Sequence, residues 1–222
     1  GVPKVLGIEP QQAIFPFART ELVPYARIHI DGTDHIPAEG PAIICGNHRS
    51  YFDPLAIGYA IAKRGRPVRF LGKKEVFDAP IVGDVARAMG GIRVDRGTGS
   101  DEPLQEATAA LGAGDMVAIM PQGTIPRGRE FFNPELKGRW GAMRLAYESR
   151  APVIPIGLWG TENVWPRSSQ FLLTPVPVAA HPLDRPARTH VHAGTAGRCP
   201  EGIPCQGPQG GRDPGLLLRR LH

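Results

Sequence analysis

The segment Ala42-Ile43-Ile44-Cys45-Gly46-Asn47-His48-Arg49-Ser50-Tyr51-Phe52-Asp53-Pro54 decides the fold. Its first four residues are a short apolar run, which is typical of an inner strand. Asp53-Pro54 predicts the start of a helix that runs to about residue 63. Proline disfavours helical geometry in the residue before it and suits the first helical position itself. A buried strand, a loop and a helix in this order are the building unit of an α/β protein.

His48 and Asp53 are separated by four residues and fall on the predicted loop and at the helix start. In such a turn the carboxylate can fold back and accept the imidazole N–H. That contact would fix the tautomer and leave the other ring nitrogen free as a base. Asp53 also suits an ordinary helix N-cap, so the pair alone leaves the catalytic and the structural interpretation open.

Further apolar runs predict alternating strands and helices. We expect strands at 27–30, 68–71, 91–94, 116–120 and 153–158, and helices at 81–89, 101–111 and 138–149. This order predicts an α/β fold: a single domain with a largely parallel or mixed central sheet flanked by helices. We expect an anchoring or wrapping segment at 1–25, the main domain at 26–180 and a Gly/Pro-rich segment at 181–222. The last is either flexible or a strand-and-loop ending.

The composition narrows the class of ligand. The 222 residues are 41% hydrophobic with a net charge of +5, and no apolar run is long enough to span a bilayer. A basic surface attracts anions, either phosphorylated metabolites, an anionic membrane or nucleic acid. Nucleic acid ranks low because no zinc-finger spacing or aromatic RNA-binding signature is present. Three cysteines form neither a disulfide framework nor a metal pattern, so we expect a reduced cytosolic protein without a metal.

Charged and small polar residues follow several predicted strands. In a parallel sheet the carboxyl ends of strands meet at one edge, where ligands bind. Arginines there suit phosphate groups, and a Gly-Thr turn can present backbone N–H groups and a hydroxyl to an anion. Taken alone, the arginine block fits a solvated edge equally well. The residues that converge at this edge are His48, Lys73, Lys74, Arg93, Arg96, Gln122, Gly123, Thr124 and Arg127.

The ordered set of motifs resembles the PlsC, or lysophosphatidate acyltransferase, family of glycerolipid acyltransferases over about residues 25–175. The motifs are Asn47-His48…Asp53, Gly91…Asp95-Arg96, Pro121-Gln122-Gly123-Thr124 and Val153–Gly157. The resemblance implies a bacterial enzyme of phospholipid biosynthesis with a glycerolipid acyltransferase-like fold. It implies acyl transfer from acyl-CoA or acyl carrier protein to the free hydroxyl of 1-acyl-glycerol-3-phosphate, without a cofactor. It also implies a peripheral position on the cytoplasmic face of the membrane.

Carried over by position, His48 and Asp53 would be the catalytic pair of an HX4D motif. The substrate contacts implied are Lys73, Lys74, Arg93, Arg96, Gln122, Gly123, Thr124 and Arg127, with backbone N–H groups near Gly123 as candidates for oxyanion stabilisation. One motif departs from the family, which mostly reads Phe-Pro-Glu-Gly-Thr-Arg. Here Gln122 replaces the glutamate and Ile125 the arginine, so Arg127 is expected to supply the phosphate contact. The variant is similar to actinobacterial relatives.

Three alternatives stay open. The acceptor could be glycerol-3-phosphate or another lysolipid. The protein could be a catalytically silent lipid- or CoA-binding protein, with Gln122 as a sign of decay. A serine hydrolase is disfavoured because no Gly-x-Ser-x-Gly elbow is present.

Cations and aromatic residues also gather after the third motif and could form an interfacial membrane patch. Its expected members are Arg127, Arg129, Phe131, Phe132, Lys137 and Arg139, with Phe15 and Phe17. The alternative is that these phenylalanines cover the core beneath a loop.

Overall fold

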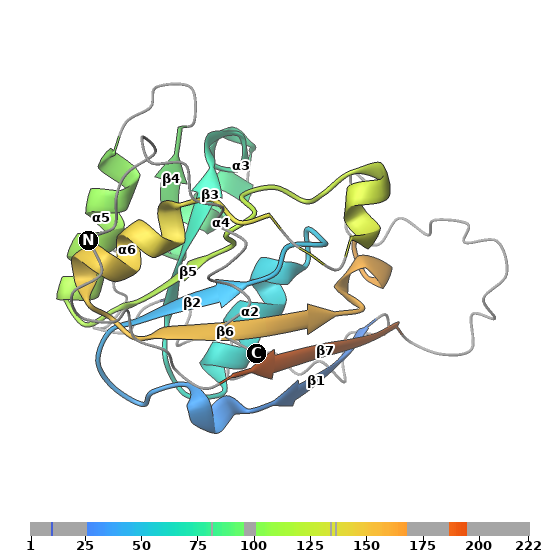
Figure 1. Cartoon of the computed structure of the whole chain (residues 1–222), viewed down its shortest axis with the longest axis horizontal. Coiled ribbons are helices and arrows are strands. Elements are labelled where there is room, and N and C mark those ends of the chain that lie inside the picture. Colours follow the sequence, from blue (N-terminus) through green and yellow to red (C-terminus); the bar gives the residue numbers. More distant parts are fainter. Residues whose placement is uncertain are drawn as a thin grey trace, which may run out of the picture.

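Seven strands form one sheet in this protein (Figure 1). The computed structural model describes residues 26–80, 82–95, 101–133, 135, 137–167 and 187–194, together with Pro10. The strands are β1 (Ala26–Asp31), β2 (Ala42–Gly46), β3 (Val68–Lys73), β4 (Ile92–Val94), β5 (Met116–Ile119), β6 (Val153–Trp159) and β7 (Ala187–Ala193). Their order across the sheet is β1-β7-β6-β2-β5-β3-β4.

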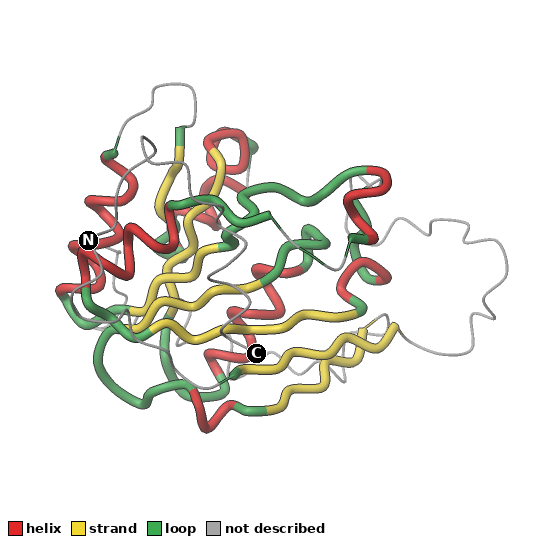
Figure 2. Tube along the Cα trace, viewed as in Figure 1, coloured by secondary structure: helices red, strands yellow, loops and turns green. Residues whose placement is uncertain are grey.

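Helices connect the strands in the described part of the chain (Figure 2). The α-helices are α2 (Asp53–Ala62), α3 (Lys74–Asp78), α4 (Val82–Ala88), α5 (Glu102–Gly112) and α6 (Gly141–Ser149). Short 3-10 helices are η3 (Thr33–His35), η4 (Gly128–Phe132) and η5 (Thr161–Asn163).

The sheet is mixed, with a parallel centre. Strands β6, β2, β5, β3 and β4 run parallel, whereas β7 pairs antiparallel with β6 and parallel with β1. The prediction of an α/β fold with a largely parallel or mixed sheet flanked by helices is therefore confirmed. The parallel centre also brings the carboxyl ends of five strands to one edge, which is the edge where the sequence predicts the site.

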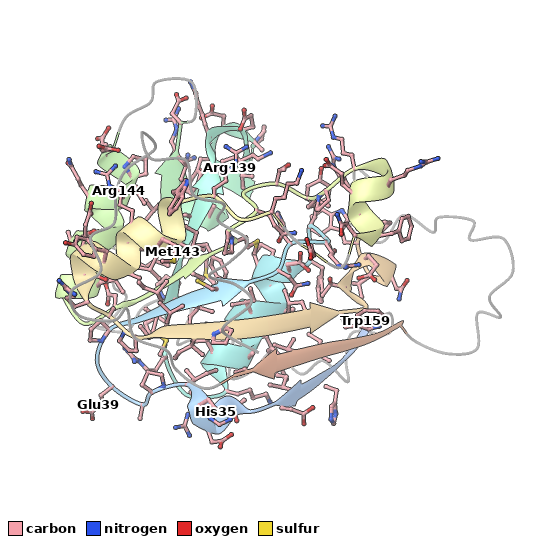
Figure 3. All side chains as sticks on the ribbon, viewed as in Figure 1. His35, Glu39, Arg139, Met143, Arg144 and Trp159 are labelled. Carbon is pink, nitrogen blue, oxygen red and sulfur yellow. The ribbon has the colours of Figure 1, made fainter. Side chains whose placement is uncertain are left out.

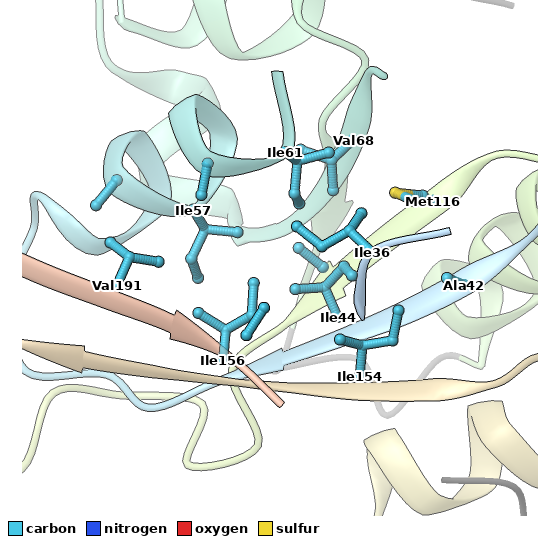
Figure 4. Close-up of a cluster of buried hydrophobic side chains, with 14 of the residues drawn as sticks. Ile36, Ala42, Ile44, Ile57, Ile61, Val68, Met116, Ile154, Ile156 and Val191 are labelled. Atoms are coloured by element: carbon cyan, nitrogen blue, oxygen red, sulfur yellow. The ribbon is translucent and has the colours of Figure 1, made fainter. Parts of the chain in front are cut away.

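Side chains on the two faces of β2 pack into two separate hydrophobic cores, because successive side chains of a strand point to opposite faces. Ile44 packs with Ile57 and Ile61 of α2 and with apolar residues of β6 and β7 (Figure 4). Ile43 packs on the other face with residues of α5 and α6. Burial on both faces explains why residues 42–45 form a continuous apolar run.

Several short elements were not expected from the sequence, whereas β7 fits the strand-and-loop alternative for 181–222. Helix α3 has five residues, too few for a helical pattern, and it buries Phe77 to 3% exposure. Helix η4 is similarly short. Strand β7 lies inside the Gly/Pro-rich segment, where Val191 and Ala193 alternate into the core. The segment 1–25 apart from Pro10, and with it Phe15 and Phe17, lies outside the described residues.

Candidate active site

The site lies where the central parallel strands end. The loop after β2 carries His48, the turn after β5 carries Gln122, and Lys73 is the last residue of β3. Helix α2 packs tightly on β2 here. A Cβ at Gly46 would meet the end of the Ile57 side chain, Cδ1, at 2.7 Å, so Ile57 of α2 packs directly against Gly46. This packing holds the first turn of α2 against the end of β2.

His48 and Asp53 form the pair that the sequence predicts. His48 Nδ1 lies 2.9 Å from Asp53 Oδ2, and the aspartate side chain is fully buried while that of His48 is 17% exposed. An ionised carboxylate only accepts hydrogen bonds, so the proton at this contact belongs to Nδ1. The lone pair of the imidazole is then on Nε2, which is the nitrogen that a general base would use.

Asp53 does not cap its own helix. Its Oδ2 accepts the backbone N–H groups of Arg49 at 2.7 Å and Ser50 at 2.8 Å, both of which precede α2. With His48, three N–H donors converge on one carboxylate oxygen. The structural alternative of an ordinary N-cap is wrong, because the carboxylate binds the main chain of the loop that precedes the helix instead.

The loop from Asn47 to Asp53 is hydrogen-bonded at Asn47 and at Ser50 to a distant part of the chain. Asn47 exchanges two hydrogen bonds with the main chain of Leu158, at 2.9 and 2.6 Å. The Ser50 hydroxyl lies 2.9 Å from the carbonyl oxygen of Thr161 and 2.6 Å from that of Trp165, and it accepts the N–H of Phe52. The sequence analysis did not assign these roles.

Gln122 contacts the Asn47–Asp53 loop directly. Its Oε1 accepts the backbone N–H of His48 at 2.6 Å, and the residue is 8% exposed. Its Nε2 is buried and has no hydrogen-bond partner among the described residues. Gln122 therefore supports the loop that carries His48.

The N–H of Gly123 itself is used within its own turn. It donates to the carbonyl oxygen of Met120 at 2.8 Å, where the φ of Gly123 is 67°. Oxyanion stabilisation by backbone N–H groups near Gly123 stays a prediction. Thr124 is half-buried beside it, whereas Arg127 is exposed at the start of η4.

The predicted cations lie at the ends of β3 and β4. Lys73 is exposed, Lys74 lies 3.4 Å from Asp95, and Arg93 lies 3.6 Å from Asp78. Lys74 and Arg93 are about half exposed, so their heads stay accessible to an anion. Arg96 lies outside the described residues.

Exposed aromatic residues surround the catalytic loop on the β6 side, and Figure 3 places Trp159 at the end of that strand. The Arg49 guanidinium lies 5.2 Å from the Phe131 ring centroid and 6.0 Å from that of Trp159. Phe132 is 79% exposed and Trp159 67% exposed. We call Tyr51, Phe131, Phe132 and Trp159 the aromatic rim. The sequence analysis found the two phenylalanines but missed Tyr51, whose ring lies 5.7 Å from that of Trp165, and Trp159, which shares the Arg49 contact with Phe131.

Metal ligands do not cluster in the described part of the chain, where no three His, Cys, Asp or Glu residues come together. Cys45 precedes the loop on β2, and burial raises the pKa of its thiol to about 12. Such a thiol is protonated at neutral pH and is unsuited to act as a nucleophile.

Comparison with known proteins decides the family. The family model described as Acyltransferase matches residues 27–159, which is more than half of the chain. This chain belongs to the acyltransferase family. It is 28% identical over 182 residues to the chloroplastic 1-acyl-sn-glycerol-3-phosphate acyltransferase LPAT1 of Arabidopsis thaliana, covering 78% of this chain and 49% of that protein.

Other relatives agree. The chain is 29% identical over 150 residues to the 1-acyl-sn-glycerol-3-phosphate acyltransferase of Borreliella burgdorferi, covering 65% of this chain and 56% of that protein. It is 27% identical over 159 residues to an uncharacterized protein of Mycobacterium tuberculosis, covering 68% and 42% respectively. The chain thus spans only about half the length of these curated relatives.

The fold has a solved counterpart. The crystal structure of the 1-acyl-sn-glycerophosphate (LPA) acyltransferase PlsC from Thermotoga maritima matches with a TM-score of 0.61 at 19% identity. The match covers 95% of this chain and 73% of that one, so the acyltransferase fold is shared. Among the described helices, none has the length and apolar character needed to cross a bilayer.

Proposed function

We propose that this chain transfers a fatty acyl group from acyl-CoA or acyl carrier protein to the free hydroxyl of 1-acyl-glycerol-3-phosphate. The product would be phosphatidic acid, and the chemistry requires no cofactor. The observation that carries the proposal is the 2.9 Å contact between His48 Nδ1 and Asp53 Oδ2 at the strand ends that also carry the cations. Glycerol-3-phosphate or another lysolipid is the second candidate for the acceptor.

His48 Nε2 is the proposed general base. The acceptor O–H gives its proton to Nε2 while its oxygen attacks the thioester carbonyl carbon. The C–S bond of the resulting tetrahedral intermediate then breaks, and the thiolate takes the proton back from Nε2. Base assistance of this kind accelerates a reaction by about 10²–10⁴. Asp53 stabilises the imidazolium that forms between the two proton transfers.

The order of the strands supports one orientation of the bound acceptor, with its phosphate toward β3 and β4 and its hydroxyl toward His48. The sheet order runs from β2, which precedes the His48 loop, through β5 to β3 and β4, which carry Lys73 and Arg93. Strand spacing places β3 roughly 10 Å from β2. A phosphate held by the cations on this side would leave a hydroxyl of the same molecule near the base. Fixing which hydroxyl reaches the base is an orientation effect.

The aromatic rim supports a peripheral position on a membrane. Exposed rings next to cations are typical of surfaces that enter the headgroup region of an anionic bilayer. Phe132 and Trp159 are too exposed to serve as a cover for the core, and the rim flanks the catalytic loop on the side away from β3 and β4. We infer that the acyl chains approach from this side, at the cytoplasmic face of the membrane.

Vesicle binding tests the membrane position. We expect a Phe132→Ala/Trp159→Ala variant to lose most of its co-sedimentation with vesicles that contain anionic lipid. Tyr147→Ala is the matched control, because Tyr147 is an exposed ring on α6 with its own Arg150 contact at 4.9 Å. Equal vesicle binding by the wild type, the double variant and the control would count against membrane binding through the aromatic rim.

An acceptor panel tests the reaction itself. Palmitoyl-CoA and oleoyl-CoA are offered with 1-acyl-glycerol-3-phosphate, glycerol-3-phosphate and other lysolipids, and free CoA is measured. We expect CoA release that depends on a phosphate-bearing acceptor. Thioester binding without CoA release for any acceptor would instead support the silent binding protein. The intact contact between Gln122 and the His48 main chain argues against decay of this site.

A further inference from the structure

The side-chain amide of Gln122 has a hydrogen-bond partner at Oε1 and none among the described residues at Nε2. Oε1 accepts the backbone N–H of His48 at 2.6 Å. A backbone N–H cannot bond to an NH₂ group, so this contact fixes the orientation of the amide and places Nε2 on the opposite side. Nε2 then carries two N–H donors, is shielded from solvent and has no partner among the residues that the structure describes.

A buried donor without an acceptor costs free energy, typically about 1–3 kcal/mol. Such groups are rare in folded proteins, and they often have a functional reason. Here the group lies in the turn after β5, a strand that pairs with β2, which precedes the His48 loop, and with β3, which ends at Lys73. A substrate whose hydroxyl reaches His48 therefore arrives beside this amide.

We propose that Gln122 Nε2 donates a hydrogen bond to a substrate oxygen that carries full or developing negative charge. The inference rests on the proposed acyl transfer and assigns a role to the residue that departs from the family motif. The oxygen belongs either to the acceptor phosphate or to the thioester carbonyl. In both cases the donor is a neutral amide, which the glutamate of the usual motif cannot replace while ionised.

The neighbouring substitution agrees with this role. Ile125 stands where the family motif has arginine, and it is 4% exposed, so no cation enters the site from that position. A glutamate at 122 would then place a second carboxylate beside the loop that already holds Asp53. An amide at position 122 keeps the acceptor for the His48 N–H and adds a donor without adding charge.

Gln122→Glu is the decisive variant because it keeps the size of the side chain and the acceptor for His48 while it removes the donor. We expect kcat/KM for the acceptor near pH 8 to fall by about 10²–10³, the usual effect of losing one donor to a developing charge. The value is expressed per folded molecule, from circular dichroism, so that partial unfolding does not decide the result. A kcat/KM within about threefold of the wild type would overturn the inference, while the proposed function would stand.

The pH dependence separates loss of the donor from general damage. A protonated carboxyl carries an O–H donor, and burial raises the pKa of a carboxyl introduced at this position. The ratio of Gln122→Glu to wild-type activity should therefore rise as the pH falls. A ratio that stays constant with pH would contradict the donor role.

Two further measurements identify the oxygen. If Nε2 contacts the phosphate, Gln122→Glu raises the KM for 1-acyl-glycerol-3-phosphate and leaves slow acyl-CoA hydrolysis without acceptor unchanged. If it contacts the thioester carbonyl, both kcat and that hydrolysis fall together. If neither the KM nor the kcat changes, the inference fails. Wild-type protein without any acyl transfer would instead refute the proposed function on which it rests.

Discussion

The hydroxyl of Ser50 lies 2.6 Å from the carbonyl oxygen of Trp165, 115 residues further along the chain. Ser50 is fully buried, and its own backbone N–H donates to Asp53 Oδ2. The residue therefore links the carboxylate of the catalytic pair to the segment that follows β6. The geometry of His48 depends on that distant segment through Ser50.

Ser50→Ala should lower kcat as well as the free energy of unfolding. Loss of the hydroxyl leaves buried groups unpaired, at about 1–3 kcal/mol, and lets the loop shift. A displacement of about 1 Å near the reacting groups can cost roughly 10² in rate. The measurement is steady-state acyl transfer together with the free energy of unfolding in urea.

Ser149→Ala is the matched control for this change. The Ser149 hydroxyl also lies 2.7 Å from a carbonyl oxygen, that of Leu145, and accepts the N–H of Ala151, but at the end of α6. We expect this variant to change stability without changing kcat. Equal kcat values for the two variants would show that Ser50 is not a positioning residue.

Asp53→Asn separates the charge of the carboxylate from its shape. The amide oxygen can still accept the N–H groups of His48, Arg49 and Ser50, so the loop should keep its conformation. The imidazolium formed in the reaction loses its counter-charge, and we expect kcat to fall by up to ~10⁴, as for other aspartates that orient a histidine. Unchanged kcat with an unchanged circular dichroism spectrum would contradict a role for the charge.

The parts of the site that the sequence predicted are local. His48 and Asp53 lie five positions apart, so a strand, a loop and a helix start were sufficient to bring them together. The strands were predicted because burial on two faces makes them continuously apolar. The helix start was predicted because proline constrains its neighbours.

The parts that the sequence did not predict depend on distant contacts. Gln122 is 74 positions from His48, and Ser50 is 115 from Trp165, so no spacing rule connects them. The sequence also did not show that the N–H of Gly123 itself is used within its turn. Trp159 lies just beyond the strand predicted at 153–158, and in the structure it is the exposed last residue of β6, in which alternate residues are buried.

The ion pair between Asp101 and Arg144 predicts a pH-dependent contribution to stability. The Arg144 guanidinium, at 2.6 Å, lowers the pKa of the Asp101 carboxyl below its ordinary value. The contribution is therefore present above the ordinary pKa of an aspartate, about 3.9, and is lost as the pH falls through the lower pKa of the folded state.

Asp101→Asn tests this contribution. Its urea midpoint should be lower than that of the wild type at neutral pH, and the difference should shrink in acid. Because Arg144 lies on α6, well away from Trp159 in Figure 3, acyl transfer at neutral pH should be unaffected. A difference in urea midpoint that grows as the pH falls would contradict a stabilising ion pair between Asp101 and Arg144.

Cys45 should be unreactive in the folded protein. With the pKa of the thiol raised to about 12 by burial, almost no thiolate exists near pH 8. In a Cys199→Ala/Cys205→Ala variant, mass spectrometry should find no iodoacetamide adduct on Cys45 until urea is added. Rapid alkylation of the native protein with loss of activity would contradict the described burial.

The central claim is that His48 removes the proton from the acceptor hydroxyl, and His48→Ala tests it most directly. The measurement is CoA release from oleoyl-CoA in the presence of 1-acyl-glycerol-3-phosphate, with circular dichroism and the urea midpoint recorded on the same samples. We predict a folded protein whose acceptor-dependent CoA release falls by at least about 10². A folded variant that releases CoA at a rate near that of the wild type would contradict the account.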